Sequence, residues 1–199
     1  MVTRTRAGSD DRKRLDALHK KLQRAKTEED VKGAWTKCLD LDYDTADDID
    51  LYTPQVIFEF KYSADLLNVQ HAAPVIAQTL YYLRRLKRGL GRKAIPGAFA
   101  LIDRTSVVIG QVGDWRDIFT DAEERFDWDL RPSSPDPRLV ATVLGHPAIR
   151  AVRAFSMEST EQSAAALRAL DQYFGAQATF DFGDKKIICL LYTSPSPRD

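Results

Sequence analysis

The sequence predicts an α/β domain in which a central mixed sheet is flanked by helices. Three short runs rich in β-branched and aromatic residues, at 56–62, 98–103 and 106–112, are typical of strands. Between the first two runs, residues 72–88 carry apolar side chains at helical spacing. Helix-like and strand-like segments therefore alternate. The 199 residues are enough to bury one core of ordinary size without disulfides.

The amino-terminal part, residues 10–38, predicts two helices. Its apolar residues at helical spacing are Leu15, Leu18, Leu22, Val31, Ala34 and Trp35. The pattern is interrupted near Thr27, whose hydroxyl we expect to cap a helix that begins at Glu28.

The stretch 41–50 is rich in Asp and lacks periodicity, so we expect a loop that leads into a strand beginning about Ile49. Pro54 and Gln55 then turn the chain. In the run VIFEFKY that follows, side chains alternate between two strand faces. One face carries Val56, Phe58, Phe60 and Tyr62, and the other carries Ile57, Glu59 and Lys61.

The segment 72–88 predicts a long amphipathic helix that ends at Gly89, with a strongly basic exposed side. Its apolar face comprises Val75, Ile76, Leu80, Leu83 and Leu86. A polar turn at Arg104 and Thr105 separates the next two strands. The loop 129–137, with three prolines and two serines, is expected to precede a smaller part that contains a helix, a strand and a helix.

Composition excludes several classes of protein. With 44% apolar and 29% charged residues and no apolar run near the roughly 20 residues that span a bilayer, we expect no membrane partner. The basic start lacks the apolar stretch of a secretory signal, which favours the cytoplasm. Two cysteines and three scattered histidines do not suggest a zinc or iron-sulfur site. Charge is uneven: residues 1–26 hold nine Lys or Arg, and 40–50 hold six Asp.

A carboxylate and an ammonium on one face of an apolar strand are the first candidates for chemistry. Period two places Glu59 and Lys61 together. Hydrolysis of a phosphodiester uses carboxylates to hold a divalent cation, and a lysine to position water or stabilise negative charge. Asp50 lies nine positions before Glu59, across the turn at Pro54, so adjacent antiparallel strands would bring both acids to one ion.

Asp50, Glu59, Phe60 and Lys61 resemble the Asp…Glu-x-Lys signature of the restriction-endonuclease-like nuclease superfamily. Asp48, on the same side of its strand as Asp50, is the alternative acid. On the following helix, Gln78 and Tyr82 share a face and resemble the Gln-x-x-x-Tyr motif of the RecB-like branch. The resemblance implies a restriction-endonuclease-like core, catalytic roles for Gln78 and Tyr82 beside the metal site, and Mg²⁺, with Mn²⁺ able to substitute. It also implies that Glu29, or its neighbour Glu28, provides a further carboxylate oxygen near the metal.

Basic residues continue from the same helix into the loop after it, where they could neutralise phosphates of double-stranded DNA. These candidate DNA-binding residues are Arg84, Arg85, Lys87, Arg88, Arg92 and Lys93. The alternative is that these basic residues form an ordinary solvent-exposed helix face that does not bind DNA.

Over residues 28–188 the chain also resembles the amino-terminal region of large bacterial restriction and modification proteins, in which a nuclease domain precedes an adenine-specific DNA methyltransferase. S-adenosylmethionine is therefore expected only if such a domain follows. We divide the chain into a basic helical segment 1–26, a nuclease core 27–130 and a helix-strand-helix appendage 131–188. Residues 189–199, CLLYTSPSPRD, resemble a translated sequencing adapter, which implies that the natural chain continues differently after Ile188.

The expected function is that of a Mg²⁺-dependent DNA endonuclease domain of a restriction-modification enzyme, with a homodimer as a partner during double-strand cleavage. Two alternatives remain open. One is a repair or recombination nuclease that processes DNA ends. The Gln-x-x-x-Tyr resemblance supports this function equally well. The other is a DNA-binding module of the same fold that has lost its activity.

Overall fold

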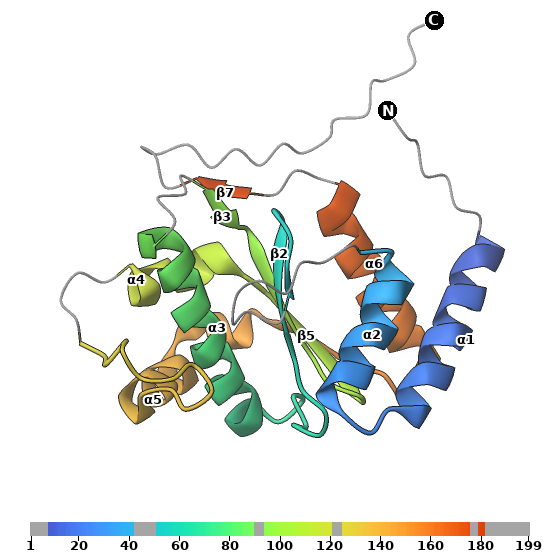
Figure 1. The fold of residues 1–199 in the computed structure, drawn as a ribbon, viewed down its shortest axis with the longest axis horizontal. Helices are drawn as coiled ribbons and strands as arrows, with labels where there is room; N and C mark the ends of the chain where they lie inside the picture. Colours follow the sequence, from blue (N-terminus) through green and yellow to red (C-terminus); the bar gives the residue numbers. More distant parts are fainter. Residues whose placement is uncertain (1–7, 42–50, 90–93, 121–124, 176–178, 182–199) are drawn as a thin grey trace, which may run out of the picture.

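A computed structural model describes residues 8–41, 51–89, 94–120, 125–175 and 179–181 (Figure 1). Its centre is a five-stranded sheet in the order β1-β2-β4-β5-β6. The central pair, β2 and β4, is parallel, and all other neighbours are antiparallel, so the sheet is mixed. The strands are β1 (Leu51–Tyr52), β2 (Val56–Phe60), β4 (Ala98–Ile102), β5 (Ser106–Gln111) and β6 (Arg153–Ser156).

Helices cover both faces of this sheet (Figure 1). One face carries α3 (Val69–Gly89), α4 (Arg116–Phe119) and α5 (Pro137–Gly145). The other carries α1 (Gly8–Arg24), α2 (Glu28–Leu39) and α6 (Thr160–Gly175). The prediction of an α/β domain with a central mixed sheet flanked by helices is therefore confirmed. None of the helices in the described residues is long and apolar enough to cross a membrane.

Smaller elements complete the described residues. A separate two-stranded antiparallel sheet pairs β3 (Ala94–Pro96) with β7 (Thr179–Asp181). There are also two 3₁₀ turns: η1 (Val112–Trp115) directly precedes α4, and η2 (Pro147–Arg150) follows α5. None of these elements was predicted from the sequence, because three or four residues are too few to display a period.

The start of α2 follows the predicted cap. The Thr27 hydroxyl accepts a hydrogen bond from the Asp30 amide at 3.2 Å, and the Asp30 carboxylate accepts one from the Thr27 amide at 3.1 Å. This reciprocal capping box satisfies two of the amides that a helix leaves without a partner in its first turn. The predicted division of residues 10–38 into two helices is confirmed.

The two faces of β2 are divided as predicted. Val56, Phe58 and Phe60 are buried in the core beneath α1, α2 and α6, whereas Ile57 is buried in the core beneath α3. All five residues of β2 are buried, as expected for a strand in a parallel pair covered on both sides. Glu59 therefore lies on the α3 side of the sheet.

The helix α3 is the crossover that makes β2 and β4 parallel. It begins at Val69, three residues before the predicted start, because the Asn68 side chain accepts a hydrogen bond from the Gln70 amide at 3.0 Å and caps it there. Its end at Gly89 is as predicted.

Residues 137–175 contain the predicted helix, strand and helix. Of these, β6 pairs with β5 and is an edge strand of the main sheet, and α6 packs against α1. The predicted helix, strand and helix therefore do not form a separate appendage. Instead, β6 belongs to the main sheet, and α5 and α6 pack against its two faces. The loop expected at 41–50 lies outside the described residues except for Leu41. Of the strand expected to begin about Ile49, the described part is β1 (Leu51–Tyr52). Residues 182–199, which include the adapter-like segment, also lie outside the described residues.

Candidate active site

The carboxyl end of β2 positions two charged side chains. Glu59 is the fourth residue of the strand, and its side chain is only 2% exposed. Lys61 follows the strand, and its amide donates to the Ile102 carbonyl at 2.8 Å, which extends the pairing with β4. The two side chains meet as predicted: Lys61 Nζ lies 2.5 Å from Glu59 Oε1.

The middle of α3 brings two more polar side chains to the same place. Gln78 Nε2 donates to Glu59 Oε1 at 2.6 Å and lies 3.1 Å from the Tyr82 hydroxyl. Both residues are buried, with 7% of Gln78 and 6% of Tyr82 exposed. The predicted helix face is confirmed, because Gln78 and Tyr82 point together toward β2.

Four predicted residues, Glu59, Lys61, Gln78 and Tyr82, thus form one contact network, which we call the Glu59 cluster. Its centre is Glu59 Oε1, which accepts hydrogen bonds from an ammonium and an amide. Burying a carboxylate is costly unless it is paired and hydrogen-bonded, and both conditions are met here. The cluster holds a negative charge in a fixed orientation beneath a helix, with a positive charge 22% exposed at its edge.

The acids expected to complete a metal site are not among the contacts of the Glu59 cluster that the described residues show. Asp50 and Asp48 lie outside the described residues. The last described pair of the β1–β2 ladder sets Leu51 opposite Phe58, and Tyr52 and Ile57 pack in the α3-side core. Within the described residues, no group of three or more His, Cys, Asp or Glu side chains is placed to hold a metal ion.

Glu29 is not brought to the Glu59 cluster. It lies in the first turn of α2, on the face of the sheet opposite α3 (Figure 1). Its side chain is 71% exposed and lies 3.8 Å from Lys32 Nζ. Glu28, beside it, is also exposed. The expectation that this helix start lends an oxygen to the metal is therefore corrected: its acidic residues stabilise the α2 N-terminus instead.

The basic residues of α3 do not share one environment. Arg85 and Arg88 are exposed, and Lys87 is half-buried. Burial lowers the pKa of Lys87, and the positive charge of Arg116 adds to this effect. Arg92 and Lys93 lie outside the described residues.

The position of Arg84 contradicts the expectation that the basic side of α3 is open to DNA. It is 4% exposed, donates to the Phe119 carbonyl at 3.2 Å, and its guanidinium lies 4.5 Å from the centre of the Trp128 ring. Trp128 belongs to the segment 125–136, which packs over α3 and covers the side of the helix that includes Arg84. The Arg84 side chain is therefore no longer a candidate for direct contact with DNA.

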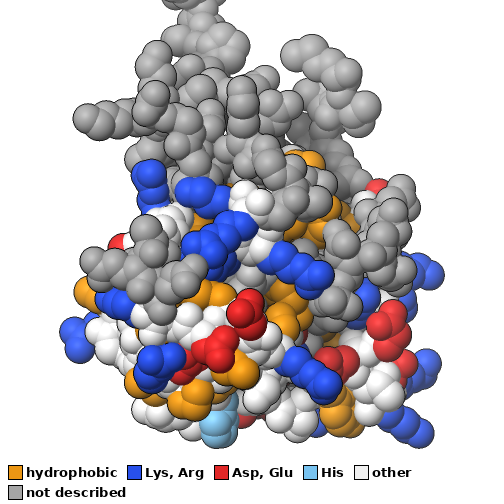
Figure 2. All heavy atoms as spheres, turned by 60° about the vertical axis from the view of Figure 1, so that its left-hand side comes forward, with side chains coloured by type: hydrophobic (Ala, Val, Ile, Leu, Met, Phe, Trp, Pro, Cys, Tyr) orange, Lys and Arg blue, Asp and Glu red, His pale blue; other side chains and the backbone are white. Residues whose placement is uncertain are grey.

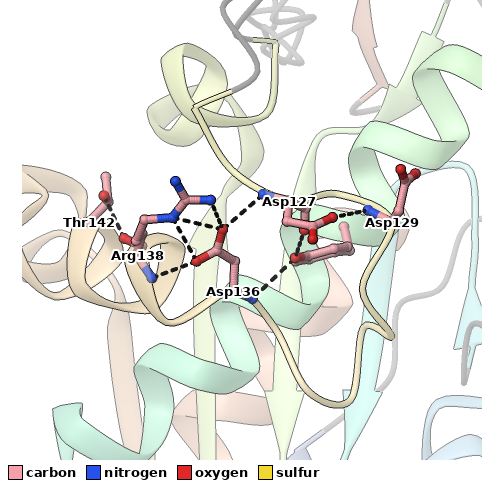
Figure 3. A network of polar contacts seen from close by, with 6 residues as sticks. Asp127, Asp129, Asp136, Arg138 and Thr142 are labelled. Atoms are coloured by element: carbon pink, nitrogen blue, oxygen red, sulfur yellow. Dashed lines mark hydrogen bonds and ion pairs between the residues drawn. The ribbon is translucent and has the colours of Figure 1, made fainter.

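A polar network that the sequence reasoning missed holds this segment in place (Figure 3). Tyr81, on α3, donates through its hydroxyl to the Asp127 carbonyl and accepts from the Asp136 amide at 3.1 Å. Asp136 also accepts from the Asp127 amide at 2.8 Å and from Arg138 Nη2 at 2.7 Å. The hydrogen bonds from Arg138 and the Asp127 amide hold the pKa of Asp136 well below its usual range. The signal was present in the sequence, since Asp136 followed by Pro137 is a typical helix start.

The turn between β4 and β5 holds a second buried carboxylate that the sequence reasoning passed over. Asp103 is fully buried, and its Oδ1 accepts from the amides of Thr105 and Ser106 at 2.6 and 2.7 Å. Both hydroxyls of these residues also lie within 3.1 Å of it. These contacts describe an Asx turn, so the role of Asp103 in this structure is to shape the hairpin.

Comparison of the chain with protein-family models, with curated proteins and with solved structures found no match. A function for the chain is therefore inferred from the geometry of the Glu59 cluster and from the sequence resemblance.

Proposed function

We propose that the chain is a metal-dependent nuclease domain with a restriction-endonuclease-like core that hydrolyses phosphodiester bonds of DNA. One observation carries the proposal: Glu59 Oε1 accepts hydrogen bonds from Lys61 at 2.5 Å and from Gln78 at 2.6 Å in a buried setting. Four of the five side chains named by the two sequence motifs, all but the undescribed Asp50, thus meet at one point. They come from β2 and α3, whose order along the chain is the order of the motifs.

The proposed metal is Mg²⁺, for which Mn²⁺ can substitute. Glu59 offers the carboxylate oxygens that hard divalent cations prefer, and it is held rigidly by Gln78. In the proposal Asp50 supplies the second carboxylate. The resemblance assigns this role to Asp50, which lies outside the described residues. When bound, the ion would polarise the scissile phosphoryl group and favour deprotonation of a water molecule.

The remaining steps are assigned to the chain's own residues. Lys61, at the exposed edge of the cluster, would orient the attacking water and stabilise the negative charge that develops on the phosphate. Gln78 keeps the Glu59 carboxylate in one orientation, and Tyr82 lies 3.1 Å from Gln78 Nε2 and so fixes the amide in turn. The exposed Arg85 and Arg88 on the same helix would neutralise phosphates of the bound DNA.

Cleavage of supercoiled and linear DNA by purified protein tests the proposal. Wild type should cut with Mg²⁺ or Mn²⁺ and not with chelator, and Glu59→Gln and Lys61→Ala should each lose at least about a hundredfold in rate. Matched controls are Glu161→Ala and Lys37→Ala, exposed charges on the opposite face of the sheet, which should cut as wild type does.

The same experiment separates the alternatives. Cutting of closed circles supports the restriction-type role, in which we propose a homodimer for double-strand cleavage, whereas activity restricted to linear DNA supports end processing. Metal-independent cutting, or cutting that survives Glu59→Gln, would overturn the proposal. DNA binding without cleavage under every condition would instead favour an inactive DNA-binding module.

A further inference from the structure

A hollow of about 460 Å³ lies between the carboxyl-terminal half of α3 and the segment 128–132, and its lining includes no residue of the Glu59 cluster. Four arginines and one aspartate line it. Arg84, Arg85 and Arg88 come from α3, and Arg131 comes from the facing segment. Figure 2 shows Lys and Arg side chains gathered on this face of the molecule.

The positive charge is not explained by the helix alone. Basic residues in the last turn of a helix stabilise its dipole, and this accounts for Arg88. It does not account for Arg131, which reaches the hollow from outside the helix. Within the part of the chain that the structure describes, the Arg131 side chain has no hydrogen bond or ion pair.

The walls of the hollow are also held in place by specific contacts. Its outer wall is held to α3 by the contact of Trp128 with Tyr81, whose ring centres are 4.9 Å apart, and by the Asp136 hydrogen bonds at the end of the segment. At its floor, Arg84 is buried, and its charge is fixed between Trp128 and the Phe119 carbonyl. A positive charge held in a poorly hydrated position acts strongly on an anion nearby.

The other lining residues are mostly apolar, and they indicate which kind of anion would fit the hollow. Leu130 is 40% exposed beside Pro132 and the rings of Tyr81 and Trp128. A ligand that fits has a phosphate for the arginines and a flat or apolar part for this wall, and its size falls in the range of small-molecule sites. Guanidinium groups bind phosphate oxygens in pairs, which favours arginine at such a site.

We propose that this hollow is a binding site for the phosphate esters of nucleotides. The ester belongs either to a DNA strand that also reaches the Glu59 cluster, an arm that rests on the proposed function, or to a free nucleotide. The exposed Arg85, Arg88 and Arg131 would contact the phosphate, and Asp129, the carboxylate in the lining, would disfavour an anion beside it.

Binding measured in chelator, without cleavage, tests the site. We would titrate fluorescein-labelled oligo(dT) and a labelled duplex by anisotropy, and deoxyadenosine monophosphate by calorimetry, into wild type, Arg85→Ala, Arg131→Ala and Arg131→Lys. The two alanine variants should each weaken binding about tenfold, and Arg131→Lys should weaken it less because the charge remains. For a strand, each should also reduce the slope of log affinity against log salt by somewhat less than one. Arg168→Ala, an exposed arginine on α6, is the control and should bind as wild type does.

Loss of strand binding with an unchanged mononucleotide isotherm assigns the hollow to DNA, and the reverse assigns it to a free nucleotide. Unchanged binding of every ligand in the hollow variants, or an equal loss in Arg168→Ala, would overturn the site. Unfolding temperatures of all variants must match, which is expected for exposed side chains. The outcome is independent of the nuclease proposal: if Glu59→Gln cleaves normally, that proposal fails while the phosphate site is judged on the binding data alone.

Discussion

Gln78, on α3, donates a hydrogen bond of 2.6 Å to the carboxylate of Glu59, on β2. The bond joins a helix to the strand beneath it across 19 positions of sequence, and both side chains are buried. A glutamate held in this way has few other orientations available. The position of the carboxylate is therefore determined by α3 as much as by β2, and this dependence can be tested directly.

Gln78→Ala should lower DNA cleavage about 10- to 100-fold, as is usual for residues that orient a metal ligand. It should also lower the free energy of unfolding by about 1–3 kcal/mol, because the buried carboxylate loses a donor. Denaturation by urea and single-turnover cleavage measure the two effects. Gln70→Ala, an exposed position on the same helix, is the control. Equal activity of the two variants would remove Gln78 from the site.

The ion pair of Lys61 and Glu59 predicts a strong coupling between the two residues. Lys61→Met alone should lower the free energy of unfolding by about 1.5–3 kcal/mol, because the carboxylate remains buried without its cationic partner. Adding Glu59→Gln should recover much of that loss, since a neutral amide is cheaper to bury. A double-mutant cycle by urea denaturation measures the coupling, and additive effects would mean that the 2.5 Å contact contributes nothing to stability.

Metal binding by the Glu59 cluster should appear as stabilisation. A ligand that binds only the folded protein raises the free energy of unfolding by about 2.7 kcal/mol at one hundred times its dissociation constant. Thermal unfolding of wild type should therefore shift upward as Mg²⁺ or Mn²⁺ is added. The shift should be absent in Glu59→Gln and present in Glu161→Ala. An equal shift in all three proteins would assign the metal to another site.

The parts of this fold that could be predicted from sequence are those whose signal is local. Period two in VIFEFKY placed Glu59 and Lys61 on one face, and the spacing of Gln78 and Tyr82 placed both on one helix face. The Thr27 cap was visible for the same reason. By contrast, β3 pairs with β7, more than eighty positions later, and a strand of three residues shows no alternation.

Arg84 shows why the environment of a helix residue is harder to predict. By its neighbours in sequence it belongs to a basic run, and only the segment 125–136, folded over α3, buries it. It is three positions after Tyr81, so both lie on the side of the helix that this segment covers. The helix α3 therefore contacts the sheet on one side and the segment 125–136 on another. The amphipathic pattern of α3 reveals only the first contact.

The Asp136 network predicts a pH dependence of stability. Its folded pKa is depressed by Arg138 and by the Asp127 amide, so its contribution is present above the unfolded pKa of about 3.9 and is lost as the pH falls below it. Asp136→Asn keeps the shape but not the charge. Urea denaturation should show the variant to be less stable at neutral pH, with the difference shrinking toward about pH 2. A constant difference across that range would mean that the charge of Asp136 is not involved.

Two glycines offer a matched test of packing in the sheet and in a helix. A Cβ on Gly110, in β5, would lie 2.2 Å from the Phe99 ring in the strand opposite, and the ring is fully buried. Gly110→Ala should therefore lower the free energy of unfolding by about 1–3 kcal/mol, the usual cost of overpacking. At Gly33, inside α2, the same change meets no atom within 4 Å and should raise it by about 0.5–1 kcal/mol. Because the chemical change is identical, the opposite signs isolate the contact with Phe99. Adding Phe99→Leu to Gly110→Ala should then cost less than the sum of the two single changes, since the smaller side chain makes room for the methyl group.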